Sequence, residues 1–227
     1  MTRKTVLLDF DDTLVNFNDA EEFAFYALAE NYQLTLNEQD LITFKEINQA
    51  HWEAFQNERL TKEEVLSKRF EAYFALHKMN VNGAHADQVF RDALANAPLS
   101  YFEHTLTTLR QLSKVHDLYI VTNGVLETQE KRIAKSLFKD YFKGVFVSEQ
   151  TGFQKPMPEF FDYVFNTIGH EKRKNSIIIG DSLTSDILGG KNAAIAPCWF
   201  NPRQNTNNTQ IHADYTIQSF DELLTII

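Results

Sequence analysis

Two carboxylates near the start of the chain have the type and the spacing for metal and acid–base chemistry. Asp9 and Asp11 follow the apolar run Val6–Leu8, which is typical of a strand buried on both faces. Side chains alternate along an extended chain, so Asp9 and Asp11 share one side while Asp12 faces the other. Such a pair repels unless a cation lies between the carboxylates or one of them is protonated. The pair therefore predicts a Mg²⁺ site or a general acid, and the alternative is that Asp11 and Asp12 only begin a turn.

Polar groups also follow a second apolar segment, residues 118–122. Thr122, Asn123 and Gly124 supply a hydroxyl, an amide and a residue without a side chain. This combination can donate hydrogen bonds to an oxyanion while the backbone approaches it closely. The alternative is that Thr122 and Asn123 only cap the helix that follows.

A lysine with a constrained backbone follows the next predicted strand. Lys155 precedes Pro156, and Pro158 can open a helix. Most lysines are solvated surface residues, but flanking prolines restrict the backbone and so favour a fixed position for this ammonium group.

Two further acids follow the apolar segment 177–180. Asp181 comes directly after Gly180, and Asp186 lies about one helical turn further on. Glycine at position 180 removes a side chain where an acid must approach another group closely.

These residues require a scaffold that brings distant strand ends together. After residue 98 the pattern predicts helices at 102–115, 126–138, 158–168, 185–193 and 219–224, and strands at 118–122, 144–148, 176–180, 197–200 and 215–217. Repeated strand–helix units predict an α/β fold with a parallel sheet and helices on both faces. Ligands bind beyond the carboxyl ends of such strands, where all the polar groups described above lie.

An all-helical insertion separates the first strand from the rest of the sheet. Residues 18–97 have helical periodicity, with breaks near 35–38, 57–61 and 80–84 that predict four helices. Thr61 and Glu64 have the spacing of a capping box.

Composition excludes several classes of protein. The chain has 227 residues, 43% of them hydrophobic, which is enough for a sizeable core. A net charge of −9 argues against nucleic acid polymers and membrane surfaces as partners. The single cysteine, Cys198, excludes an intramolecular disulfide and is expected in the core. We find no signal-peptide core or membrane span, so we expect a cytoplasmic protein, and nothing in the sequence indicates its oligomeric state.

All four polar groups fall at predicted strand ends and together form the inventory that phosphoryl transfer requires. In this the sequence resembles the haloacid dehalogenase (HAD) superfamily. The resemblance spans the whole chain and rests on four motifs in order: Asp9–Thr13, Thr122, Lys155, and Gly180–Asp181 with Asp186. It implies a Rossmann-like core formed by residues 1–16 and 99–227, with a helical C1-type cap at 17–98.

The resemblance also implies a mechanism. Asp9 would attack phosphorus to form an aspartyl-phosphate, and Asp11 would protonate the leaving oxygen and then activate water. Mg²⁺ would be held by the Asp9 side chain, the Asp11 backbone carbonyl and Asp181, and Lys155 would keep Asp9 ionised. In addition, Thr122, Asn123 and Lys155 would bind the transferring phosphoryl group, and the residues supporting them would be Asp186 and Thr13.

Two features separate subclasses within this superfamily. Its dehalogenases lack an acid at the position of Asp11, because a halide leaving group needs no proton, so Asp11 favours phosphate chemistry. The helical block lies between the first and second motifs, which is the place of a C1-type cap. Such a cap would close over the site and exclude water, with hinges near residues 15–18 and 97–102.

The substrate is expected to be a small phosphate monoester. Phe17 and Trp52 are candidates to stack on a base, although aromatic residues at helical spacing are more often part of a core. The segments 121–131, 150–158 and 180–190 resemble the bacterial pyrimidine 5′-nucleotidase branch. That branch hydrolyses nucleoside 5′-monophosphates such as dUMP and dTMP, and noncanonical pyrimidine nucleotides.

Three alternatives remain open at this level. A sugar-phosphate or phosphoglycolate-type phosphatase would use the same catalytic residues. A phosphosugar mutase would also use Asp9 and Asp11, but it would return phosphate to the substrate. A noncatalytic regulatory module could retain the fold without the chemistry.

Overall fold

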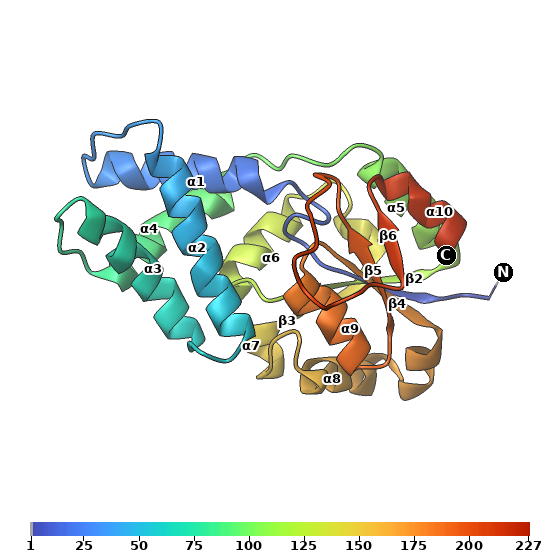
Figure 1. Ribbon diagram of the computed structural model, residues 1–227. Coiled ribbons are helices and arrows are strands. Elements are labelled where there is room, and N and C mark those ends of the chain that lie inside the picture. The colour runs from blue at the N-terminus through green and yellow to red at the C-terminus, as the bar shows by residue number, and fades with distance from the viewer. Residues whose placement is uncertain (1) are drawn as a thin grey trace. The chain divides into compact units, whose positions relative to one another are not determined.

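The structure, a computed structural model, describes residues 2–227 in two compact units (Figure 1). The core unit comprises the chain up to Phe17 together with Leu99–Ile227, and the helical unit comprises Asn18–Pro98. Along the described residues, no helix has both the length and the apolar character needed to cross a membrane.

The core unit is built on a parallel sheet. Within residues 2–227, six strands pair in the order β3-β2-β1-β4-β5-β6, and every pairing is parallel. The strands are β1 (Thr5–Leu8), β2 (Asp117–Thr122), β3 (Phe142–Val147), β4 (Ser176–Gly180), β5 (Ala196–Phe200) and β6 (Tyr215–Ile217). The predicted parallel sheet of an α/β fold is therefore confirmed.

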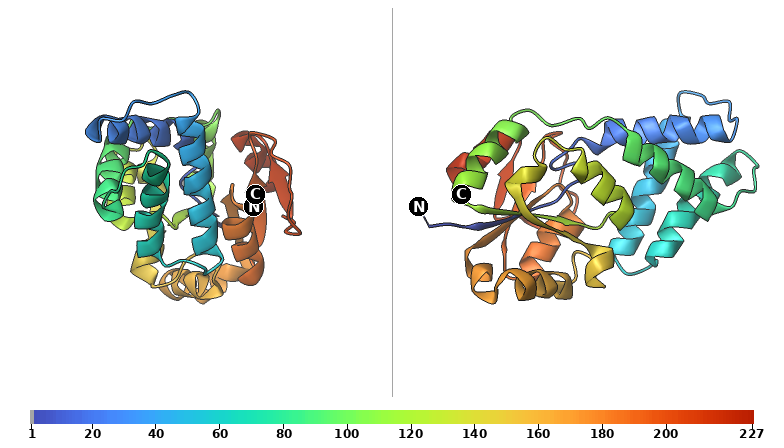
Figure 2. Two further views of the ribbon diagram at one scale, coloured as in Figure 1. Left: turned by 60° about the vertical axis from the view of Figure 1, so that its left-hand side comes forward. Right: turned by 180° about the vertical axis from the view of Figure 1, so that it is seen from behind.

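Strand β1 is central because its side chains are apolar on both faces. Val6 and Leu8 contribute to one hydrophobic cluster and Leu7 to another, and all three side chains are fully buried. The first cluster includes side chains from α5, α6 and α10, and the second includes four from α8, so helices cover both faces (Figure 2). These helices are α5 (Thr105–Val115), α6 (Leu126–Ala134), α8 (Pro158–Ile168) and α10 (Leu223–Ile226).

Register determines which strand ends meet. Leu8, the last residue of β1, is paired with Ile120 of β2 and with Ile179 of β4. Residues that follow these strands therefore emerge at the same edge of the sheet. Cys198 is buried in β5, as predicted from its apolar surroundings.

Several boundaries differ from the prediction. The expected helix at 185–193 is divided into a π-helix, η3 (Leu183–Ile187), and α9 (Leu188–Asn192). The π-turn arises because the Ile187 N–H donates to the carbonyl of Ser182, five residues earlier. Helix α6 ends at residue 134, and β3 runs two residues ahead of the predicted start. The helix predicted at 219–224 is present as η4 (Phe220–Glu222) followed by α10. Short segments that the periodicity could not reveal are α7 (Ser148–Thr151), η1 (Lys139–Tyr141) and η2 (His170–Asn175).

The helical unit has four helices among the described residues, as predicted. They are α1 (Phe17–Asn31), α2 (Asp40–Gln56), α3 (Lys62–Leu76) and α4 (Gly83–Asn96). The capping box of Thr61 and Glu64 is present at the start of α3. Phe44 packs against Phe25, Phe70 and Phe90 with ring centroids 5.0–5.8 Å apart, so each helix contributes an aromatic ring to this core.

A polar network lies beside these rings and also draws on all four helices. Asn48 donates to Glu21, and Arg69 donates to Asn48 at 2.7 Å and to Asp87 at 2.6 Å. Asp87 also accepts from Arg91 at 2.6 Å. All of these side chains except Arg91 are buried, so the charges of Arg69 and Asp87 depend on each other.

The two segments that lead into and out of the helical unit are joined within the core unit. The backbone N–H of Asn16 donates to the carbonyl of Ser100 at 2.9 Å. Arg203 donates to Asn16 at 2.7 Å and to Asp12 at 2.8 Å, and its guanidinium lies over the ring of Phe102. The chain therefore leaves and re-enters the core unit at neighbouring points.

Candidate active site

Asp9 lies at the carboxyl end of β1 and is held there by the neighbouring strand. Its backbone N–H donates to the carbonyl of Ile179 in β4 at 3.0 Å. The side chain is 11% exposed. Burial raises the pKa of Asp9 to about 8 in spite of the opposing charge of Lys155, and Asp186 and Asp11 add to the rise.

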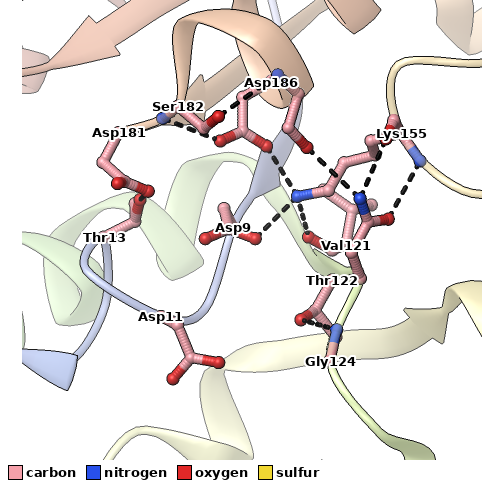
Figure 3. A network of polar contacts seen from close by, with 12 residues as sticks. Asp9, Asp11, Thr13, Val121, Thr122, Gly124, Lys155, Asp181, Ser182 and Asp186 are labelled. Carbon is pink, nitrogen blue, oxygen red and sulfur yellow. Dashed lines mark hydrogen bonds and ion pairs between the residues drawn. The ribbon is translucent and has the colours of Figure 1, made fainter. Parts of the chain in front are cut away.

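Lys155 connects three strand ends (Figure 3). Its Nζ donates to Asp9 Oδ1 at 2.6 Å, to Asp186 Oδ1 at 2.6 Å and to the carbonyl of Val121 at 2.9 Å. The side chain is 1% exposed, so this ammonium group is not one of the usual solvated lysines. Burial alone would lower the pKa of Lys155, but the charges of Asp186 and Asp9 outweigh it and raise that pKa above its ordinary value.

Asn123 fixes the backbone that carries Lys155. The Asn123 side-chain amide donates to the Lys155 carbonyl and accepts from the Lys155 N–H, both at 2.9 Å. The prediction that Asn123 binds phosphate therefore depends on its backbone N–H. Thr122 Oγ1 accepts from the N–H of Gly124 at 3.1 Å, and its own hydroxyl hydrogen can donate to a substrate oxygen.

Asp181 and Asp186 bring two further carboxylates to the same edge. One ligand atom from each of Asp9, Asp181 and Asp186 lies within 4.8 Å of the others. Asp186 Oδ2 accepts from the N–H of Ser182 at 3.2 Å, and Thr13 donates to Asp181 at 3.4 Å. Both Asp186 oxygens are therefore occupied by protein donors, whereas Asp181 faces Thr13 and Asp9 (Figure 3).

The chemistry of this acidic group fits Mg²⁺. Burial, followed by the charges of Asp12, Asp9 and Asp186, raises the pKa of Asp181 well above its ordinary value. The positive charge of Lys155 alone does not offset the negative charge of these neighbouring carboxylates. A divalent cation bound beside Asp9 and Asp181 would favour their ionised forms. Carboxylate and carbonyl oxygens are the ligands that Mg²⁺ prefers, so the predicted set of Asp9, Asp181 and the Asp11 carbonyl is chemically suitable.

Asp11 is not a hydrogen-bond partner of Lys155 and lies away from Lys155 in Figure 3. Its Oδ1 accepts from Arg132 and its Oδ2 accepts from Gln129 at 2.7 Å, and its side chain is 28% exposed. Neither α6 residue was singled out from the sequence. A signal was available, since Gln129 and Arg132 are polar residues at i and i+3 on the face of α6 that also carries the buried Ile133.

The two aromatic candidates for substrate contact have neighbours within their own units. The ring of Phe17 lies 5.5 Å from the guanidinium carbon of Arg132. Trp52 makes an edge contact with Phe55 and lies 5.8 Å from the guanidinium carbon of Arg69. Base recognition by Phe17 and Trp52 stays a prediction.

Comparisons with known proteins agree on one family. The family model for haloacid dehalogenase-like hydrolases matches residues 3–194. YfnB of Bacillus subtilis, a protein designated a HAD-hydrolase, is 39% identical over 99% of this chain and 95% of its own length. A crystal structure of YfnB, described as bound to magnesium and as revealing interdomain movement, superposes with a TM-score of 0.93 over 100% of this chain and 99% of that chain.

Two further relatives have a named activity. The pyrimidine 5′-nucleotidase PynA of Streptococcus pneumoniae is 33% identical over 99% of this chain and 94% of its own length. The pyrimidine 5′-nucleotidase YjjG of Escherichia coli is 30% identical over 96% of this chain and 95% of its own length.

Proposed function

The chain belongs to the haloacid dehalogenase-like hydrolase family and is a phosphatase, and we propose that its substrates are pyrimidine nucleoside 5′-monophosphates. In this proposal dUMP, dTMP and noncanonical analogues are hydrolysed with Mg²⁺ through an aspartyl-phosphate. The proposal includes the C1-type cap at 17–98 as the unit that selects the substrate, and a cytoplasmic location. Its support is the full-length similarity to PynA and YjjG, which are named for this activity.

The observation that carries the chemistry is the position of Lys155. This buried ammonium group donates hydrogen bonds to both Asp9 and Asp186. A carboxylate oxygen of Asp181 lies within 4.8 Å of a carboxylate oxygen of each of these acids. A fixed cation beside a carboxylate nucleophile is what phosphoryl transfer needs, because negative charge spreads over the phosphoryl oxygens.

The proposed reaction has two steps. An oxygen of Asp9 forms a bond to phosphorus while the bond to the leaving oxygen breaks, and the leaving oxygen takes its proton from Asp11. Water then attacks the aspartyl-phosphate and gives a proton to Asp11 as the electron pair of the breaking bond returns to Asp9. The net change is ester plus water to alcohol plus phosphate.

The remaining site residues bind and orient. Thr122 and the Asn123 backbone donate hydrogen bonds to the transferring oxygens, and Lys155 offsets their charge. When bound by Asp9, Asp181 and the Asp11 carbonyl, Mg²⁺ would neutralise the phosphoryl group. Asp186 holds Lys155 by accepting its hydrogen bond, and Thr13 holds Asp181 by donating one.

A substrate panel tests the proposed specificity. Phosphate release is measured from dUMP, dTMP, UMP, AMP, glucose phosphates and phosphoglycolate, and we expect the pyrimidine nucleotides to have the highest kcat/KM. Equal turnover across the panel would contradict the nucleotide assignment. Transfer of phosphate between sugar positions without its release would identify a mutase.

Asp9→Asn tests the nucleophile. We expect turnover to fall by a factor on the order of 10⁴, since the amide cannot form the phosphoenzyme. Asp19→Asn, which changes an exposed acid, is the control and should retain full activity. An Asp9→Asn enzyme with near-normal kcat would show that phosphorus is attacked by another group.

Chelation tests the metal assignment. Thorough EDTA treatment is expected to abolish phosphate release, and added Mg²⁺ is expected to restore it. Activity that survives complete removal of divalent ions would mean that the acidic group has another role.

A further inference from the structure

Helix α6 presents two buried polar side chains to the carboxylate proposed as general acid. Gln129 and Arg132 are each 1% exposed and lie one helical turn apart. They are the only residues for which a hydrogen bond to the Asp11 side chain is found along residues 2–227.

The contacts form a network that joins Arg132, Gln129, Asp11 and Thr122. Arg132 Nη1 donates to Asp11 Oδ1 at 2.5 Å and to Gln129 Oε1 at 3.1 Å. Gln129 Nε2 donates to Asp11 Oδ2 at 2.7 Å and to Thr122 Oγ1 at 2.9 Å. Because a guanidinium can only donate, Gln129 Oε1 must face Arg132, and this leaves Gln129 Nε2 to donate to Asp11 and Thr122. Gln129 thus links the proposed acid to the hydroxyl proposed to bind phosphate.

The surroundings of the network favour this arrangement over free rotation of Asp11. The guanidinium carbon of Arg132 lies 5.0 Å from the ring centroid of Phe10 and 5.5 Å from that of Phe17. Glycine at position 124 leaves space for Gln129, since a Cβ there would clash with the Gln129 amide. Both helix residues are therefore confined by packing while Asp11 is partly exposed.

Packing alone does not account for an arginine at this position. Within the described part of the chain, Nε and Nη2 of Arg132 are buried without a hydrogen-bond partner. Unpaired buried donors cost free energy that an aliphatic side chain would avoid, so the hydrogen bond from Nη1 to Asp11 is the compensating interaction.

We propose that Arg132 and Gln129 are positioning residues for proton transfer by Asp11. They hold both oxygens of its carboxyl group in one orientation beside Thr122. From there Asp11 gives its proton to the leaving oxygen as the electron pair of the breaking P–O bond moves to that oxygen. This inference rests on the proposed role of Asp11 as general acid and adds the helix that orients it.

The experiment compares two leaving groups. An alkyl ester, the nucleoside 5′-monophosphate, needs a proton on its departing alkoxide, whereas p-nitrophenyl phosphate releases a phenolate that does not. With enzyme in excess over substrate and Mg²⁺ saturating, release of the alcohol in the first turnover reports on the first step alone. The variants are Gln129→Met, Arg132→Met and Arg132→Lys, with Asp11→Asn as the reference.

We expect Gln129→Met and Arg132→Met to slow the alkyl ester by about tenfold or more relative to their effect on the aryl ester. Arg132→Lys, which keeps the charge, should recover part of the loss. Either change combined with Asp11→Asn should be no slower than Asp11→Asn alone, because the residues act through Asp11. Lys131→Met, at an exposed site of the same helix, is the control and should match the native enzyme.

Several outcomes would overturn the inference. Equal slowing of both esters would mean that the two residues support the fold and not the proton transfer, and native rates on both would mean that they have no role. If Asp11→Asn discriminates between the esters and the helix variants do not, the inference fails while the proposed function stands. If Asp11→Asn does not discriminate, the proposed role of Asp11 fails first. Thermal unfolding identifies a variant that does not fold, and Gln129→Met and Arg132→Lys then provide the test.

Discussion

Gly180, which has no side chain, leaves room for Asp186 to reach Lys155. Lys155 therefore binds acids that follow both β1 and β4. A Cβ on Gly180 would overlap the carboxylate of Asp186, the group that accepts from Lys155 Nζ at 2.6 Å. The absence of a side chain at the end of β4 is therefore part of the site's construction, as the sequence predicted for a close approach by an acid.

Gly180→Ala is expected to displace Asp186 and to lower kcat by about a hundredfold, because Lys155 would lose one of its two charged partners. The check is steady-state phosphatase activity beside a circular-dichroism spectrum of the folded protein. Gly144→Ala in β3 is the matched control, since a Cβ there would meet Tyr119 at an ordinary 3.4 Å. Equal losses in the two variants would show that strand packing alone explains the effect.

Individual residues differed in how far they could be predicted. The acids that follow β1 and the glycine before Asp181 indicated the candidate catalytic edge, because residues after parallel strands emerge at the same edge of the sheet. Gln129 and Arg132 were missed because a polar residue on a helix usually faces solvent. Their spacing placed them on the face of α6 that carries Ile133, but their contact with Asp11 is visible only in the tertiary structure. Similarly, no pattern shows that the side chain of Asn123 would hold the backbone of Lys155.

At the scale of elements, the edge of the sheet opposite the site has its own electrostatic centre. Asp117, the first residue of β2, accepts from Arg3 ahead of β1, from Lys143 in β3 and from Lys172 in η2. Partial burial would raise the pKa of Asp117, but the hydrogen bonds from Lys143, Arg3 and Lys172 hold it well below its ordinary value. One carboxylate thus ties together the amino ends of neighbouring strands.

Asp117→Asn is expected to lower the free energy of unfolding by about 1–2 kcal/mol at pH 7 while leaving kcat unchanged. The carboxylate has a lower pKa in the folded state than in the unfolded state, so its stabilisation is complete above about pH 4 and is lost as the pH falls further. Urea unfolding at pH 7 and pH 3 should show a difference between variant and native protein that shrinks in acid. A constant difference, or an equal effect of the exposed Asp140→Asn, would contradict this account.

The elements themselves were largely predictable. Parallel strands and the four inserted helices were predicted because apolar periodicity is strong in buried segments. The π-turn within the helix predicted after β4 was not, because it depends on the hydrogen bond from the Ile187 N–H to the Ser182 carbonyl. Such local hydrogen bonds leave no periodic signature.

At the scale of the whole molecule, the two units have separate cores. The helical unit combines its aromatic cluster with the buried pair Arg69–Asp87, whose charges are compensated within that unit. Burial lowers the pKa of Arg69, while Asp87 opposes that effect, so the pair is stable only when both members are present.

Asp87→Ala is expected to destabilise the helical unit by about 3–5 kcal/mol, because it leaves a buried guanidinium unpaired. Hydrogen exchange followed by mass spectrometry should then show faster exchange in α1–α4 and unchanged protection in β1, β2 and β4. Asp92→Ala, an exposed position on the same helix, should change neither. Uniform loss of protection across the chain would mean that the two units unfold together.

The hydrogen bond between Asn16 and Ser100 has a consequence for how such a protein could diversify. Because the chain leaves and re-enters the core unit at adjacent residues, the inserted helical unit is connected to the core unit at one place. Changes to residues 18–98 therefore leave the pairing of β1 with β2 and β4 intact, so the proposed substrate selection by this insert can evolve apart from the phosphate chemistry.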